Sequence, residues 1–192
     1  MRRERNFIGP AGMGGTVGLW GASSLIRSVQ RGTISAISTT TGTSTITAVD
    51  LTNCVLVWNG YRQNANPSTT TSIAYMGLSV AGTTVTGTRT TGSDNAQVDW
   101  ELIEYQPGVI KSVQRGTKSI NGSGTPYTQT ITAVNPDKSS LAYIGMTGDS
   151  NTWQAQFQPI SRISSATAIT TDLFYNGGSL GYTLYWQVVE TF

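Results

Sequence analysis

Apolar and polar residues alternate along much of this chain with a period of two. In the segment 97–105, for example, Trp100 and Leu102 alternate with Glu101, the spacing that places successive side chains on opposite faces of a pleated strand. Thr and Val are frequent in such segments, and β-branched residues favour strands. Gly-Thr, Asn-Gly and Gly-Ser pairs separate the segments as turns do in a sandwich or barrel. The pattern predicts strands near 24–37, 44–50, 53–61, 72–80, 84–90 and 97–105, with copies in the second half of the chain.

Three blocks of this sequence occur twice, in the same order. The blocks are Ile-Arg-Ser-Val-Gln-Arg-Gly-Thr at 26–33, repeated at 110–117 with one Lys for Arg; Thr-Ile-Thr-Ala-Val at 45–49 and 130–134; and Trp-Glu-Leu-Ile-Glu at 100–104, which recurs as Trp-Gln-Val-Val-Glu at 186–190. Ordered recurrence of this kind indicates an internal duplication.

The repeated blocks divide the chain into four parts. We predict an N-terminal arm at 1–24, a first β-sandwich at 25–105, a short Gln-Pro-Gly hinge at 106–108 and a second β-sandwich at 109–192. The expected fold class is all-β, with two tandem antiparallel β-sandwich domains preceded by an extended, Gly-rich arm.

The composition removes several kinds of chemistry. The sequence contains no His, the commonest general base and metal ligand, and its single Cys, Cys54, cannot form a disulfide within the chain. Asp99 and Glu101 lie two apart on a strand, as a glycosidase pair could, but the copy of Glu101 is Gln187. Asp149, in a Gly-Asp-Ser-Asn segment, suits a turn better than a calcium site. We therefore predict no enzymatic activity, no metal and no cofactor.

Charge is sparse and concentrated at one end of the chain. Only 11% of residues are charged, and the net charge of +2 resides in residues 1–5. A neutral body offers no basic face for nucleic acid, and no run of apolar residues is long enough to span a membrane. The charged tip at 1–5 is either a frayed, solvated end or, as we expect, part of an arm at 1–24 that docks on a partner. The arm residues expected to contact that partner are Arg2, Arg3, Arg5, Phe7, Ile8 and Trp20.

Aromatic residues without a counterpart in the other copy are further candidates for partner contact. Tyr61, Trp153 and Tyr175 are of this kind, whereas Trp100 and Trp186 occupy the same position in both copies and are expected in the core. Large, rigid rings suit a protein interface, and they equally suit a carbohydrate-binding face. The sequence leaves both interpretations open.

One Arg and one Glu are retained in both copies of a chain that has few charges. Arg31 and Arg115 occupy the same place in the first block, and Glu104 and Glu190 close the last. We expect Arg31 to pair with Glu104 and Arg115 with Glu190, which would tie the first strand of each sandwich to its last. The alternative is that all four are surface residues.

The repeated blocks also resemble those of a known family. Ile-Lys/Arg-Ser-Val-Gln-Arg-Gly-Thr opening a domain, Thr-Ile-Thr-Ala-Val-Asp/Asn after it and Trp-Gln-Val-Val-Glu closing it are similar to a β-rich domain of small structural proteins in tailed bacteriophages. The resemblance covers both copies but not the arm. It implies a virion component assembled in the host bacterial cytoplasm, in contact with major capsid or tail proteins and with copies of itself.

Capsid decoration is the expected placement within such a particle, because the chain is small and lacks the repeats of a fibre shaft. The alternatives are a tail or neck component, or a carbohydrate- or receptor-binding module with a surface glycan as its partner.

Overall fold

The computed structural model describes residues 25–36, 39–64, 75–90, 95–121, 126–148, 159–172 and 181–192, and these are all-β with antiparallel sheets, as predicted. The elements are β1 (Ile26–Ala36), β2 (Thr41–Thr45), η1 (Leu51–Asn53), β3 (Cys54–Asn64), β4 (Gly77–Ala81), β5 (Thr84–Thr88), β6 (Asn95–Tyr105), β7 (Ile110–Asn121), β8 (Tyr127–Thr130), η2 (Pro136–Lys138), β9 (Ser139–Gly148), β10 (Ile160–Ser165), β11 (Ala168–Asp172) and β12 (Gly181–Thr191). η1 and η2 are single turns of 3-10 helix.

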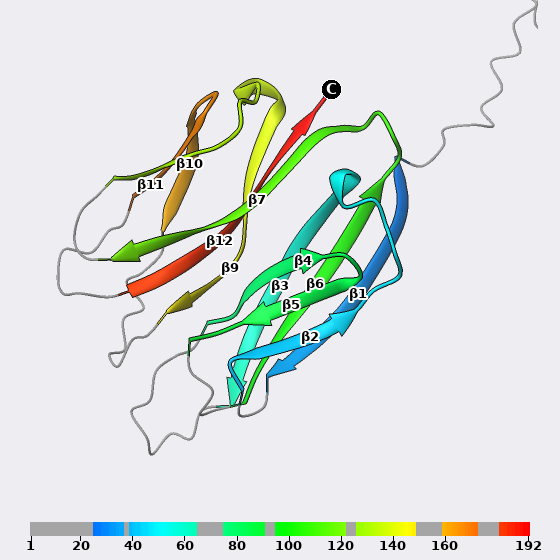
Figure 1. Ribbon diagram of the computed structural model, residues 1–192, viewed down its shortest axis with the longest axis vertical. Coiled ribbons are helices and arrows are strands. Elements are labelled where there is room, and N and C mark those ends of the chain that lie inside the picture. The colour runs from blue at the N-terminus through cyan, green and yellow to red at the C-terminus, as the bar shows by residue number, and fades with distance from the viewer. Residues whose placement is uncertain are drawn as a thin grey trace, which may run out of the picture.

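Strands β1 to β6 build the first half of the molecule (Figure 1). In one sheet β6 lies between β1 and β3, and in the other β5 lies between β2 and β4. The inward side chains of both sheets form one apolar cluster, to which β3 contributes Leu56, β4 contributes Leu78 and β6 contributes Trp100. Two sheets that enclose a common core in this way form a sandwich-like unit.

Strands β7 to β12 build the second half with the same order of strands. β12 lies between β7 and β9, and β11 lies between β10 and β8, so each position is filled by the sixth strand after its counterpart. A second apolar cluster includes Ile131, Ile169 and Trp186. A pairing of Gly77 in β4 with Gly145 in β9 joins β2-β5-β4 and β9-β12-β7 into one six-stranded sheet.

The segment expected as a strand at 44–50 differs in the structure. The strand is β2, which ends at Thr45, and the next five residues run alongside β1 without strand pairing. The side chain of Gln30 binds the backbone of Thr47 in place of a neighbouring strand, and Asp50 accepts from the Thr52 N–H to cap η1. The expected strand at 72–80 corresponds to β4, and residues 72–74 lie outside the described residues.

The predicted hinge at 106–108 forms a hydrogen-bonded turn. The Gln106 N–H donates to Leu25 O at 2.8 Å, and the Val109 N–H donates to Gln106 O at 3.2 Å. Gly108 has a φ of +88°, which favours glycine. The described residues contain no helix of the length and apolar character that a bilayer crossing requires.

Cys54 is fully buried at the start of β3, and its Sγ donates to Asp50 O at 3.1 Å. Burial raises the pKa of this thiol to about 11, so the reactive thiolate is scarce at neutral pH. We expect native protein at pH 8 to react with a thiol reagent such as Ellman's reagent at least about 100-fold more slowly than urea-unfolded protein. Equal rates in the two states would show that the thiol is accessible.

Candidate functional site

The glycine of the repeated Gln-Arg-Gly-Thr segment makes room for a tryptophan ring in each half. Gly32 in β1 lies opposite Trp100 in β6, and Gly116 in β7 lies opposite Trp186 in β12. A Cβ added at Gly32 would lie 2.8 Å from the Trp100 ring, and one added at Gly116 would lie 2.6 Å from the Trp186 ring. Both rings are buried, which confirms that these two aromatics belong to the core.

The glutamine of the same segment binds backbone groups. Gln30 Nε2 donates to Thr47 O at 3.0 Å, and Gln30 Oε1 accepts from Thr47 N at 2.7 Å. Gln114 binds Thr132 in the same way, at 2.9 and 2.7 Å. An amide side chain both donates and accepts, so it satisfies both backbone groups of one extended residue. The contact holds the Thr-Ile-Thr-Ala-Val block against the first strand of its half.

The glutamate that closes the first half is buried and binds the start of β1. Glu104 accepts from Arg27 Nη1 at 3.1 Å and from Ser28 Oγ at 2.9 Å. It also accepts from the backbone N–H of Asp50, the residue that caps η1, at 3.3 Å. One carboxylate therefore ties together the first strand, the last strand and the turn before β3.

Glu190 closes the second half with an equivalent set of contacts. It accepts from Lys111 Nζ at 2.8 Å, from Ser112 Oγ at 3.1 Å and from the N–H of Asn135, the cap of η2, at 2.9 Å. Its exposed fraction is 2%. A carboxylate at this depth is stable only because its oxygens are hydrogen-bonded and a cation lies beside it.

The expected pairing of Arg31 with Glu104 and of Arg115 with Glu190 is wrong. Arg31 lies directly opposite Glu101 in the β1–β6 register and binds both of its carboxylate oxygens, at 2.8 and 3.1 Å. Glu104 lies three residues further along β6, so its side chain is on the opposite face of the strand. Arg115 binds backbone carbonyl groups of the first half, not Glu190.

Gln187 occupies in β12 the place that Glu101 has in β6, but it contacts the other half of the molecule. It lies opposite Arg115 in the register of β12 and β7, with an exposed fraction of 1%. Its Oε1 accepts from Leu56 N at 3.2 Å, and its Nε2 donates to Leu56 O. Gln187 therefore covers the outer edge of β3. Without it, the N–H and C=O of Leu56 would have no partner, because no strand among the described residues pairs with β3 on this side.

Arg115 binds the same edge beside Gln187. Its Nη1 donates to Leu51 O at 3.2 Å, and its Nη2 donates to Cys54 O. Burial lowers the pKa of this guanidinium from its ordinary value, although an arginine remains charged at neutral pH. We use the name junction clamp for Arg115, Gln187 and the backbone groups that these two side chains bind.

Glycines allow the two halves to approach closely beside the junction clamp. The ring of Tyr185 packs on the first apolar cluster and lies against Gly77, where an added Cβ would collide with it. Gly145 has a φ of +110°, and a Cβ there would collide with the carbonyl group of Met76. The part of the outward face of β7-β12-β9 that carries Arg115, Tyr185 and Gln187 is thus in contact with the first half.

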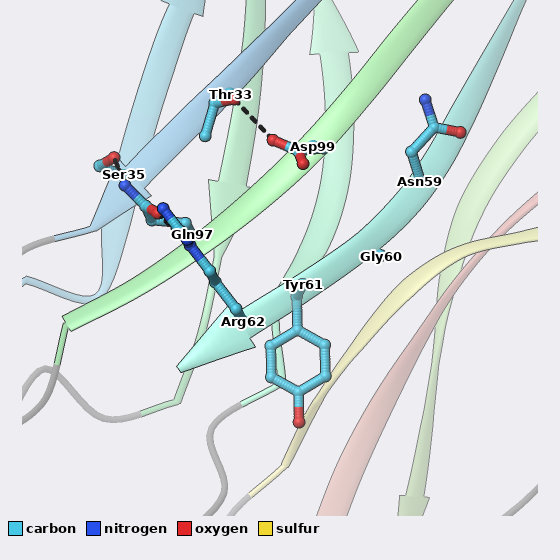
Figure 2. Close-up of a pocket in the computed structure, with 8 residues that line it drawn as sticks. All are labelled: Thr33, Ser35, Asn59, Gly60, Tyr61, Arg62, Gln97 and Asp99. Atoms are coloured by element: carbon cyan, nitrogen blue, oxygen red, sulfur yellow. Dashed lines mark hydrogen bonds between the residues drawn. The ribbon is translucent and has the colours of Figure 1, made fainter. Parts of the chain in front are cut away.

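The equivalent face of the first half is open and polar. The side chains of β1, β6 and β3 are hydrogen-bonded to one another across it: Thr33 donates to Asp99, Arg62 donates to Gln97, and Gln97 donates to Ser35 at 2.9 Å. They line a groove of about 570 Å³, shown in Figure 2. With Arg31 and Glu101 added, the face has two cations and two carboxylates, so its charges balance. We call it the open face.

The predicted partner-binding residues are only partly tested by this geometry. Tyr61 lies at the groove, but its ring points away from Gln97 and Asp99 (Figure 2). The ring contacts Trp58, with centroids 6.2 Å apart, and Tyr75, with centroids 5.1 Å apart. Burial raises the pKa of the Tyr61 hydroxyl to about 12. The other predicted contact residues lie outside the described residues: Arg2, Arg3, Arg5, Phe7, Ile8, Trp20, Trp153 and Tyr175.

Asp99 and Glu101 lie on the same face of β6, as the period of two predicts, but each is engaged by a neighbouring side chain of β1. Within the described stretches, no three residues among His, Cys, Asp and Glu cluster in a way that could hold a metal ion.

Comparison of the chain with protein-family models, curated proteins and solved structures finds no match.

Gln187 is the most important contact residue that the sequence analysis did not identify as one. The signal is a change of residue type: Glu101 in the first half becomes Gln187 in the second, next to an Arg that is unchanged. A second signal is Arg27, which becomes Lys111 and so keeps its positive charge. Neither change of residue identifies a contact partner by itself, because the partner depends on the strand register.

Glu190 makes the stability of the protein dependent on pH. Its pKa lies below the ordinary value of 4.5, first because of the hydrogen bond from Lys111 and then because of those from Asn135 and Ser112. The unfolded chain therefore takes up this proton at higher pH than the folded chain, and the free energy of unfolding decreases as pH falls below 4.5.

We expect E190Q to be less stable than the wild type at pH 7 and to show a weaker loss of stability between pH 5 and pH 3. Some dependence should remain, because hydrogen bonds from Thr52 and Asn53 also lower the pKa of Asp50. Urea unfolding at several pH values measures this, with K111M as the matched variant that removes the Lys111 donor. An unchanged pH profile in E190Q would contradict the assignment.

Proposed function

We propose that this chain is a structural protein of a bacteriophage particle, a capsid decoration or cement component that acts through non-covalent contacts and is not an enzyme. We further propose that its two sandwich-like units arose by duplication of one domain. The repeated blocks support the duplication because they make the same contacts in both halves. The glycine–tryptophan, glutamine–backbone and glutamate–Ser contacts each occur once in either unit.

The observation that carries the proposal is that most carboxylates of the described residues are engaged in contacts within the chain. The carboxylates engaged in this way are those of Asp50, Asp99, Glu101, Glu104, Asp172 and Glu190. The junction clamp joins the two units through buried hydrogen bonds. A body of this kind, with fixed units and a neutral surface, suits repeated contacts with neighbouring subunits.

The proposal is tested by a cryo-EM reconstruction of the particle to which the chain belongs. We expect density for both units on the capsid surface, bridging neighbouring capsid subunits. A location confined to the tail or neck would replace decoration by the corresponding alternative, and absence from the particle would overturn the proposal.

The role of the arm is tested in the same system. A chain lacking residues 1–24 should show the circular dichroism spectrum of a folded β protein but fail to enter particles, because the basic and apolar arm is proposed to dock on a neighbouring subunit. Normal incorporation of the shortened chain would contradict this role of the arm.

A second candidate function, binding of a surface glycan, is favoured by the groove of the open face. Its hydroxyl, amide, carboxylate and guanidinium groups are the donors and acceptors that a saccharide requires, although the Tyr61 ring is turned away from them. Glycan-array binding that is lost in R62A would support this function.

A further inference from the structure

We propose that Asp99 and Glu101 prevent the open face from binding the strand edge of a second copy, so that head-to-tail association of units ends at two within one chain. This inference rests on the duplication proposed above. It concerns what the open face excludes, not where the chain is placed in a particle.

The junction clamp shows how one unit binds the edge of another. An amide side chain, Gln187, meets the N–H and the C=O of Leu56, and a guanidinium, Arg115, meets two carbonyl groups next to them. Tyr185 adds an apolar ring two residues from Gln187, on the same face of β12. The face therefore supplies one side chain that both donates and accepts, one cation and one ring.

The second unit has an edge of the same kind in the first part of β9, before Gly145 pairs with Gly77 of β4. Leu141 lies opposite Val188 of β12, as Leu56 lies opposite Leu102 of β6, and η2 precedes β9 as η1 precedes β3. The backbone groups of Leu56 point away from β6, because they bind Gln187. Those of Leu141 therefore point away from β12, at an edge where no side chain among the described residues binds as Gln187 binds Leu56.

The open face of the first unit is the counterpart of the face that makes the junction clamp. Arg31 stands in the place of Arg115, but Glu101 replaces Gln187 and Asp99 replaces Tyr185. If this face met the β9 edge of a second copy, it would contact a carbonyl group and an N–H at Leu141, in the manner of the junction clamp.

A carboxylate is the wrong group for that contact. Glu101 could accept from the Leu141 N–H, but it has no hydrogen to donate to the Leu141 carbonyl group, whose oxygen would face a negative charge. Arg31 is already held by Glu101 at 2.8 Å, so binding two carbonyl groups would also cost this ion pair. Asp99 would place a second charge where the junction has a packed ring, and burying an unpaired charge is costly.

The test uses the full-length double variant D99Y/E101Q, which gives the open face the residues of the junction face. We expect concentration-dependent self-association, measured by sedimentation velocity, about 10- to 100-fold tighter than that of the wild type. The comparison with wild type removes any association through the arm, which is the same in both proteins. A folded double variant that sediments as the wild type does would overturn the proposal.

Two further variants make the result specific. The triple variant D99Y/E101Q/A142K adds a lysine at an exposed position of β9 beside Leu141 and should return to wild-type behaviour, because a charged side chain blocks strand-edge contacts. Association as strong as that of the double variant would overturn the proposed partner edge. If D99Y/E101Q does not fold, the isosteric single variant E101Q serves as the test. It should self-associate more tightly than the wild type, by a smaller factor than that expected for the double variant. A folded E101Q that sediments as the wild type does would overturn the proposal. None of these outcomes bears on particle incorporation, so this inference and the proposed function fail separately.

Discussion

Replacing Gly145 with alanine should destabilise the protein by about 3–5 kcal/mol, among the largest effects expected of a single substitution. Gly145 lies in β9 with a φ of +110°, a conformation that residues with a Cβ adopt only under strain. The added Cβ would also collide with the carbonyl group of Met76 and approach Gly77. Because these are backbone atoms of the neighbouring strand, they cannot move without separating β4 from β9.

Gly60 provides the matched control for this substitution. It lies at the equivalent position of β3 with a φ of +106°, but no atom of the described residues lies within 4 Å of an added Cβ, apart from Gly60 itself and its chain neighbours. G60A should therefore show the backbone strain alone, about 1–3 kcal/mol. Urea unfolding followed by far-UV circular dichroism measures both variants. Equal losses of stability would show that the approach of β9 to β4 contributes nothing beyond strain.

Replacing Gln187 with alanine should reduce the free energy of unfolding by about 2–5 kcal/mol, since it leaves two buried backbone groups of Leu56 without partners. The amide that now binds them is almost fully buried, so no water replaces it without entering the junction between the halves. R115A should have a smaller effect in the same direction, because it removes the donors to Leu51 O and Cys54 O.

The corresponding change in the first half should have little effect. Glu101 forms an ion pair with Arg31, whose side chain is 65% exposed, and exposed ion pairs contribute less than about 1 kcal/mol. E101A and Q187A therefore alter equivalent positions in the two halves, but one removes an exposed ion pair and the other removes a buried amide. If E101A were as destabilising as Q187A, the junction clamp would not be the source of the effect.

The sequence by itself determined that the chain is all-β, and it placed Trp100 and Trp186 in the core. The period of two in the segment 97–105 places Trp100 and Leu102 on one face and Glu101 on the other. The structure confirms this arrangement, with Trp100 and Leu102 buried. This could be predicted because side-chain direction in a strand depends only on position along the strand. The recurrence of Trp at 186 indicated a second core residue for the same reason, and Trp186 is buried.

The tertiary structure alone decided which charged and polar side chains meet. Arg31 and Arg115 stand in identical six-residue segments, yet one binds a carboxylate in its own unit and the other binds carbonyl groups of the neighbouring unit. A hydrogen bond between distant segments depends on strand register and on which face a second unit covers. Neither is encoded in the local pattern, because both result from the packing of sheets whose residues are far apart in sequence. The exchange of Glu101 for Gln187 is visible in the sequence. Its structural role is not, because the edge of β3 that Gln187 binds lies beside it only in the folded chain.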